Sequence, residues 1–231
     1  MATTHKKKWQ PRLPPIKLGG AVPFFKVFAE SKTWIYYSPN FLSDISFNSL
    51  LSTIPFETEI KPSGSGHSRK TAWLGETKYE YAGKDNAPFP IPEQVAIIMK
   101  KAQERANEIL MSQNEEKSVT YKNVLAVLYE TGQNSVPYHR DAEDSIIPNS
   151  PISSVSYGTS RIFNMRPYKS AVHKAMAILP ATMEIQLDDN SILIMGGECQ
   201  KHWSHGIDKD FSKKDPRMNF TFRAMLDLVN R

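Results

Sequence analysis

The chain has 231 residues, of which 40% are hydrophobic and 23% charged, and its formal net charge is +5. These values are typical of a globular protein with one sizeable core, and the modest positive charge weakly favours a polyanionic partner such as nucleic acid. A single cysteine, Cys199, excludes an internal disulfide framework and a zinc site made of several cysteines. The apolar runs are too short to cross a bilayer and no hydrophobic segment follows the N-terminal lysines, so we expect an intracellular protein without a membrane segment, nuclear or cytoplasmic if eukaryotic.

The first half of the chain predicts a basic arm, a strand and two helices. Residues 1–20 carry several Lys and Arg, several prolines and no acidic residue, which is typical of a flexible arm. Aromatic and β-branched residues at 33–42 predict a strand, and 43–54 predicts a helix that begins at a Ser or Asp cap. Residues 61–92 mix Gly, Ser and Pro with basic and aromatic residues, which favours a long, partly ordered loop region with short strands. The apolar spacing of 92–113 predicts the longest helix.

After that helix the sequence predicts short strands. They are rich in β-branched or aromatic residues and are separated by Gly, Pro, Asn and Asp turns, at 123–130, 152–158, 161–168, 183–187, 191–197 and 218–226. This pattern favours an antiparallel sandwich or barrel. We therefore expect one domain over 21–231, a β-sandwich supported by helices.

A histidine and a carboxylate follow the first of these strands in the spacing H-x-D. His139 and Asp141 would point to the same side of an extended chain, where both could bind one metal ion. Taken alone, an H-x-D pair more often belongs to a solvated loop than to a metal site. A third donor, His205, would complete the set of two histidines and one carboxylate that binds iron and leaves positions open for co-substrate and dioxygen. His202 is the alternative third ligand.

The segment 217–223, RMNFTFR, alternates polar and apolar residues. On a strand, its two arginines, Asn219 and Thr221 would share one face. Such alternation commonly means a strand with its polar face in water. Two arginines on that face also suit a dicarboxylate, because guanidinium groups bind carboxylates through paired hydrogen bonds.

Together these segments resemble the AlkB-type iron(II) and 2-oxoglutarate dependent dioxygenases, which reverse N-alkylation of nucleic-acid bases. The resemblance covers roughly 33–226 and looks closest to the eukaryotic-type repair members. It is carried by HRD (139–141), HGI (205–207) and RMNFTFR (217–223), similar to the family's H-x-D, distal His and R-x-N-x-T-x-R, and is supported by TAWLGETKYEY, SPISSVSYGTSRIFNMR and DNSILIMGGECQKHWSHGI. It implies a mainly β fold with flanking helices (α+β) around a double-stranded β-helix (jelly-roll) core.

The resemblance also implies roles for the site residues. His139, Asp141 and His205 would hold iron(II). Arg217, assisted by Tyr129, would pair with the distal carboxylate of 2-oxoglutarate, while Asn219 and Arg223 would serve the end that chelates the metal. One position departs from the family, which often has Asn two residues before the tyrosine where this chain has Val127. The valine could weaken co-substrate binding, or another group could replace the missing contact.

Residues for the nucleic acid are implied as well. Glu143 falls where the family has an acidic residue facing the damaged base, although it could be a surface carboxylate or the cap of a turn. The segment 61–92 resembles the family's nucleotide-recognition lid. There aromatic rings could stack on a flipped base or simply pack, and a basic side chain could meet phosphate. These candidates are Trp73, Tyr79, Tyr81, Arg69 and Lys70.

The activity implied is oxidative demethylation of 1-methyladenine and 3-methylcytosine in DNA or RNA. Iron(II) is the expected cofactor, 2-oxoglutarate and dioxygen are the co-substrates, and formaldehyde and succinate are released. The expected partner is a single strand or a flipped base, and we expect a monomer. Two alternatives remain: a 2-oxoglutarate-dependent hydroxylase of a protein side chain, and a non-catalytic nucleic-acid-binding protein.

Overall fold

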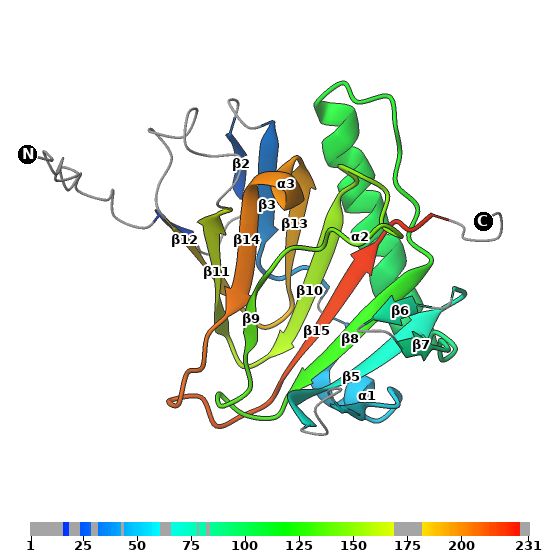
Figure 1. The fold of residues 1–231 in the computed structure, drawn as a ribbon, viewed down its shortest axis with the longest axis vertical. Helices are drawn as coiled ribbons and strands as arrows, with labels where there is room; N and C mark the ends of the chain where they lie inside the picture. The colour runs from blue at the N-terminus through cyan, green and yellow to red at the C-terminus, as the bar shows by residue number, and fades with distance from the viewer. Residues whose placement is uncertain are drawn as a thin grey trace, which may run out of the picture.

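The protein, described from a computed structural model, is a sandwich of two β-sheets with a long helix against the outer face of the larger sheet (Figure 1). The structure describes residues 16–18, 24–28, 32–42, 44–60, 66–77, 79–81, 84–168 and 182–226. For the residues 16–18, 24–28, 59–60, 66–68, 79–81 and 84–86, only the backbone is described.

The larger sheet has eight strands and the smaller sheet five. The larger runs in the order β2 (Phe24–Phe28), β3 (Thr33–Ser38), β13 (Ser191–Gly197), β10 (Ile152–Gly158), β15 (Arg217–Arg223), β8 (Asn123–Tyr129), β5 (Gly66–Gly75) and β4 (Glu57–Ile60). The smaller runs in the order β1 (Ile16–Leu18), β12 (Met183–Leu187), β11 (Arg161–Pro167), β14 (Trp203–Ile207) and β9 (Val136–His139). A separate hairpin joins β6 (Tyr79–Tyr81) to β7 (Lys84–Asn86), and the helices are α1 (Phe47–Leu51), α2 (Glu93–Ser112) and α3 (Cys199–His202).

Two hydrophobic cores lie on the two faces of the larger sheet. On one face, α2 buries its apolar stripe, Val95, Ile98, Ala102, Ala106 and Ile109, against the sheet. On the other face, the two sheets pack together around side chains such as Tyr37, Leu193 and Trp203. The spacing of the α2 stripe is that of an amphipathic helix, so the longest predicted helix is confirmed nearly to the residue.

Strand β15 is central to both cores because it is buried on both faces. Met218, Phe220 and Phe222 lie in the core beneath α2. The alternate residues Arg217 and Arg223 are only 1% and 5% exposed. The interpretation in which this polar face meets water is therefore wrong, because the smaller sheet covers it. The two sheets and their antiparallel strands confirm the predicted jelly-roll sandwich.

Several segments differ from the sequence expectation. Gly66–Gly75 is a ten-residue strand between β8 and β4, not part of a loop, although the short strands β6 and β7 do occur in 61–92. Ile16–Leu18, placed in the flexible arm, pair in parallel with β12, and residues 1–15 lie outside the described residues. His205 lies inside a strand instead of after one.

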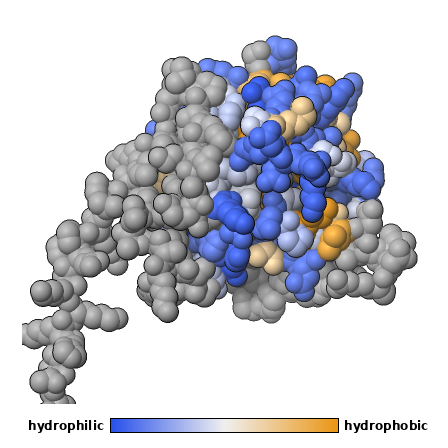
Figure 2. All heavy atoms as spheres, turned by 90° about the horizontal axis from the view of Figure 1, so that it is seen from above, coloured by the Kyte–Doolittle hydropathy of each residue, from blue (hydrophilic) through white to orange (hydrophobic). Residues whose placement is uncertain are grey.

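The described side chains on the face shown in Figure 2 are mostly hydrophilic, with a few scattered hydrophobic ones. Within the described part of the chain, no helix has both the length and the apolar character needed to cross a membrane.

Candidate metal centre

Two histidines and an aspartate meet where β9 pairs with β14 at the edge of the smaller sheet. The strand register places His139 opposite His205, and Asp141 follows β9 by two residues. The ligand atoms of the three residues lie within 4.8 Å of one another. His205 Nε2 is 3.6 Å from Asp141 Oδ2, and His139 Nε2 is 3.9 Å from Asp141 Oδ1. Two imidazoles and one carboxylate in this arrangement fit iron(II) and leave further coordination positions open.

The protonation states of these groups are those of metal ligands. Burial lowers the pKa of His205 to about 3, which keeps its imidazole neutral at pH 7. Burial alone would raise the pKa of Asp141, but the charges of Arg223, His205 and His139 outweigh it and lower that pKa to about 2. His139 Nδ1 lies 2.9 Å from the carbonyl oxygen of Pro137, which can only accept, so Nδ1 donates and Nε2 is the nitrogen that faces the other donors.

The local backbone explains why the two histidines can face each other. Gly206 follows His205, and a Cβ at this position would lie 2.8 Å from the carbonyl oxygen of Val136 on the neighbouring strand. The absence of a side chain lets β9 approach β14 closely. The alternative ligand His202 lies outside the donor group, and its Nε2 is 3.1 Å from Glu198 Oε2. The structure therefore brings His205, and not His202, to His139 and Asp141.

The donors open onto a cavity between the two sheets. Phe163 stacks on the His205 ring with centroids 5.1 Å apart, and Met195 and Ile207 form part of the apolar wall of the cavity. The polar residues around the cavity, besides the donors, include Arg69, Tyr129, Ser154, Asn219, Thr221 and Arg223. A cavity with apolar walls and a few convergent polar groups is the usual form of a small-ligand site.

A hydrogen-bonded network links β15 and β10 beside this cavity. Arg217 Nη2 donates to Asn219 Oδ1 at 2.8 Å and to Ser156 Oγ at 2.9 Å. Asn219 Oδ1 also accepts from Ser154 Oγ at 2.9 Å. The Arg217 guanidinium lies 5.0 Å from the centre of the Tyr129 ring. Arg217 does not itself line the cavity, but its contacts Asn219 and Tyr129 do.

Arg217 is a buried cation without a neutralising carboxylate among the described residues. No carboxylate pairs with Arg217 among the residues that the structure describes, and its buried Nε and Nη1 atoms have no hydrogen-bond partner there. Burial lowers its pKa to about 10, so it remains charged at pH 7. A buried cation with unused donors fits an anionic ligand that carries a carboxylate. Arg223, by contrast, donates to Asp141 Oδ1 at 2.6 Å.

The implied nucleic-acid residues are distributed differently from the expectation. Trp73 is 6% exposed and its Nε1 donates to the carbonyl oxygen of Thr77, which supports packing over base contact. The side chains of Tyr79 and Tyr81 lie outside the described part of the chain. Arg69 lines the cavity and donates to the carbonyl oxygen of Ser135 at 3.3 Å. Lys70, its neighbour, pairs with Glu130 at 2.8 Å.

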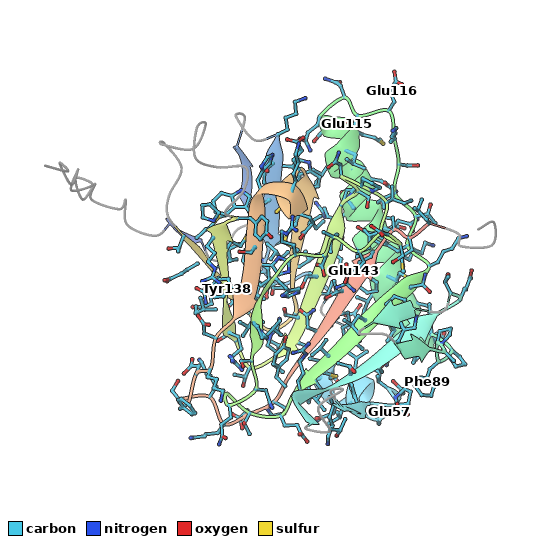
Figure 3. The ribbon with its side chains drawn as sticks, viewed as in Figure 1. Glu57, Phe89, Glu115, Glu116, Tyr138 and Glu143 are labelled. Atoms are coloured by element: carbon cyan, nitrogen blue, oxygen red, sulfur yellow. The ribbon has the colours of Figure 1, made fainter. Side chains whose placement is uncertain are left out.

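Glu143 lies beyond the end of β9, in a segment without regular secondary structure. Its carbonyl oxygen accepts from the Ile146 amide, which closes a turn, and it is not among the residues that line the cavity. The segment after β9 crosses to the larger sheet, where the Ile147 amide donates to the Ala224 carbonyl. Figure 3 labels Tyr138, which belongs to β9 of the smaller sheet, and Glu143, which lies on this crossing segment.

Sequence reasoning missed three residues around the site. Ser154 and Ser156 are buried on β10, and their signal was the repeated serine in an otherwise apolar strand. Gln200 accepts a hydrogen bond from the Asp141 amide at 3.0 Å. No local pattern pointed to Gln200, because this contact joins segments far apart in the chain.

Known proteins resemble this chain in sequence and in fold. The family model of the 2OG-Fe(II) oxygenase superfamily matches residues 36–223. The human "Alpha-ketoglutarate-dependent dioxygenase alkB homolog 3" is 31% identical over 157 residues, 68% of this chain and 51% of that protein. The mouse "DNA oxidative demethylase ALKBH2" is 30% identical over 173 residues, 73% of this chain and 67% of that protein.

A solved structure described as "The structure of OsALKBH1" has a TM-score of 0.58 at 20% identity, covers 82% of this chain and 96% of that one, and shows the fold alone. The chain spans about half the length of the alkB homolog 3 proteins that it matches, 51% for the human protein. With the family model matched over most of its length, the chain belongs to the 2OG-Fe(II) oxygenase superfamily and, within it, to the AlkB-type dioxygenases.

Proposed function

We propose that the protein is an iron(II) and 2-oxoglutarate dependent dioxygenase that demethylates N-alkylated bases, 1-methyladenine and 3-methylcytosine, in DNA or RNA. The observation that carries the proposal is the donor set of His139, Asp141 and His205 on a cavity wall, with the uncompensated cation Arg217 beside it. The relatives named as a DNA oxidative demethylase and as alkB homolog 3 support the choice of substrate class.

In this proposal His139, Asp141 and His205 hold iron(II). When bound, the iron and 2-oxoglutarate allow dioxygen to oxidise the N-methyl carbon, and the products are succinate, carbon dioxide, formaldehyde and the repaired base. Arg217 and Tyr129 bind the distal carboxylate of 2-oxoglutarate, and Asn219 and Arg223 serve the end at the metal. The chain thus orients the co-substrate and, with its apolar walls, limits access of water.

Mass spectrometry of methylated single-stranded DNA and RNA, incubated with the protein, iron(II) and 2-oxoglutarate, tests the proposal. Loss of the methyl mass together with succinate formation is expected. Hydroxylation of peptide pools without reaction of either oligonucleotide would favour the protein hydroxylase instead. Strand binding that chelation leaves unchanged, without succinate, would indicate the non-catalytic binder.

The proposal includes the partner, the oligomeric state and the location. We propose a single strand or a flipped base of DNA or RNA as the partner, a monomeric protein of one dioxygenase domain over 21–231, and a nuclear or cytoplasmic location in a eukaryote. The lid at about 61–92 would contact the strand, and Arg69 or the tyrosines Tyr79 and Tyr81 would be its contact residues.

Val127→Asn is expected to leave 2-oxoglutarate binding unchanged or to strengthen it slightly. Val127 lines the cavity and pairs with Asn219 across β8 and β15, where Ser154 already supplies a hydroxyl to the Asn219 side chain. One added hydrogen bond contributes about 0.5–1.5 kcal/mol, or at most about a tenfold gain in affinity. Calorimetry with 2-oxoglutarate measures the change. A severe loss would mean that the pocket has repacked around valine.

Glu143→Gln is expected to lower activity on 1-methyladenine and 3-methylcytosine by more than activity on 3-methylthymine. The first two bases are cationic near neutral pH and present an amino donor, so a nearby carboxylate supplies both charge attraction and a hydrogen bond. Turnover of 2-oxoglutarate without strand should change little. Parallel kinetics on the three bases measure the difference.

The turn that Glu143 closes with Ile146 offers a structural alternative for this residue. The turn uses the main chain, which Glu143→Gln leaves intact, so a purely structural role predicts equal kinetics on all three bases. A uniform fall, or no fall, would remove Glu143 from base recognition.

A further inference from the structure

We propose that Gln200 is a positioning residue for the metal ligand Asp141, an inference that rests on the proposed iron site. The two histidine ligands are fixed by strand pairing, because His139 and His205 face each other across β9 and β14. Asp141 has no such support, since β9 ends at His139 and no regular secondary structure covers 140–143. A ligand outside the sheet needs another anchor.

The anchor is the side chain of Gln200 on the short helix α3. Its Oε1 accepts from the Asp141 amide at 3.0 Å, and its Nε2 donates to the sulfur of Met195 at 3.6 Å. Its carbonyl oxygen accepts from Arg140 Nη1 at 3.4 Å. Gln200 therefore holds both Arg140 and Asp141 of the segment that leaves β9.

The helix α3, which carries Gln200, directly precedes the strand of another metal ligand. The helix lies between β13 and β14 in the chain and leads directly into the strand that carries His205 (Figure 1). Gln200 thus connects the backbone of Asp141 with the segment that leads to His205.

A second contact acts on the side chain of Asp141. Arg223 donates to its Oδ1 at 2.6 Å, which attracts the carboxylate toward β15. The Gln200 contact fixes the main chain of Asp141, so the carboxylate can meet Arg223 and still present Oδ2 beside His205 Nε2, 3.6 Å away. Partners that orient a ligand in this way typically contribute about 10- to 100-fold to metal affinity.

Two substitutions separate this role from simple packing. Gln200→Leu removes the acceptor for the Asp141 amide. Gln200→Glu keeps an acceptor oxygen, loses the donor to Met195 and adds a negative charge, which by itself would not weaken the binding of a cation. Dissociation constants for Mn(II), measured from the EPR signal of the free ion, are compared with the thermal unfolding of the metal-free proteins. Lys201→Ala is the matched control, because Lys201 lies on the same helix, is exposed and pairs with Glu198 at 3.0 Å.

Gln200→Leu is expected to weaken Mn(II) binding by about 10- to 100-fold. Lys201→Ala should bind Mn(II) like the wild type and Gln200→Glu no more weakly than the wild type, and the melting temperatures of all three should stay close together. Unchanged affinity in Gln200→Leu, or equal losses in the Leu and Glu variants, would overturn the inference. Failure of the wild type itself to bind Mn(II) would instead contradict the proposed metal site, and absence of demethylation with normal Mn(II) binding would affect only the proposed substrate.

Discussion

His139→Ala is expected to abolish turnover, because it removes one of the three protein ligands of the iron. It should weaken iron(II) binding by more than about 10- to 100-fold, which is the usual cost of losing a residue that only hydrogen-bonds to a ligand. The His139 side chain is 43% exposed, so its truncation should leave the melting temperature of the metal-free protein nearly unchanged. Titration with iron(II) under nitrogen and demethylation of a methylated oligonucleotide measure the two effects. Normal demethylation would contradict the metal assignment.

His202→Ala provides the matched control. His202 lies on α3, bonds Glu198 and is excluded from the donor group by its position, so its loss should leave iron binding intact. If His202→Ala were inactive and His205→Ala active, the third ligand would need revision. Asp141→Ala should also be inactive, but it leaves Arg223 without its carboxylate in a buried site and should unfold more readily. Asp141→Asn keeps an acceptor for Arg223 and is the better variant for iron binding alone.

The elements with a strong repeating pattern could be predicted from the sequence. The helix α2 and the strands β8, β10, β12 and β13 were expected close to their observed bounds, because their apolar spacing reflects the face that each buries. The strands β9 and β14 were not predicted. The four residues of β9 include Pro137, and β14 includes Gly206 with Ser204, so both resemble turns and become strands through pairing with distant segments.

The site was predictable to the extent that spacing and resemblance determined it. The alternation in 217–223 correctly indicated which residues share a face, but it could not indicate that this face lies under the smaller sheet. Glu143 was assigned by its match to the family, and the resemblance did not indicate that its carbonyl oxygen closes a turn with Ile146. Gln200 was absent from the expectation because its contact with Asp141 depends on how α3 lies against the crossing segment. Loop contacts of this kind leave no periodic trace in a sequence.

Arg217→Met is expected to raise the dissociation constant of 2-oxoglutarate by about 30- to 700-fold, which corresponds to about 2–4 kcal/mol for the loss of a buried charge-assisted contact. The KM for the methylated strand should change far less. Calorimetry of the Mn(II)-loaded protein with 2-oxoglutarate measures the first effect, and steady-state kinetics measure the second. Equal rises in both constants would argue for a phosphate contact instead.

Arg217→Met should weaken co-substrate binding but should not lower the stability of the metal-free protein. Arg217 is 1% exposed and has no carboxylate partner among the described residues, so methionine of similar length should leave the free energy of unfolding unchanged or increase it. Asn219 Oδ1 would still accept from Ser154, and the Ser156 hydroxyl, which can also act as a donor, would lose only its contact with Arg217. Arg217→Lys keeps the charge but loses the planar guanidinium with its paired N–H donors. Its affinity for the co-substrate should therefore fall between those of the wild type and Arg217→Met.

Arg161→Met is the matched control for Arg217→Met, because both arginines lie near the Tyr129 ring but have different partners. Arg161 donates to the carbonyl oxygens of Asn134 and Asp208, at 2.9 Å and 2.6 Å, and so ties together two loops. Its loss leaves carbonyl groups without donors and should lower the melting temperature. Arg217→Met should lose co-substrate affinity without that cost in stability. If Arg217→Met were instead destabilised like Arg161→Met while binding 2-oxoglutarate normally, Arg217 would be a structural residue that holds Asn219 and Ser156.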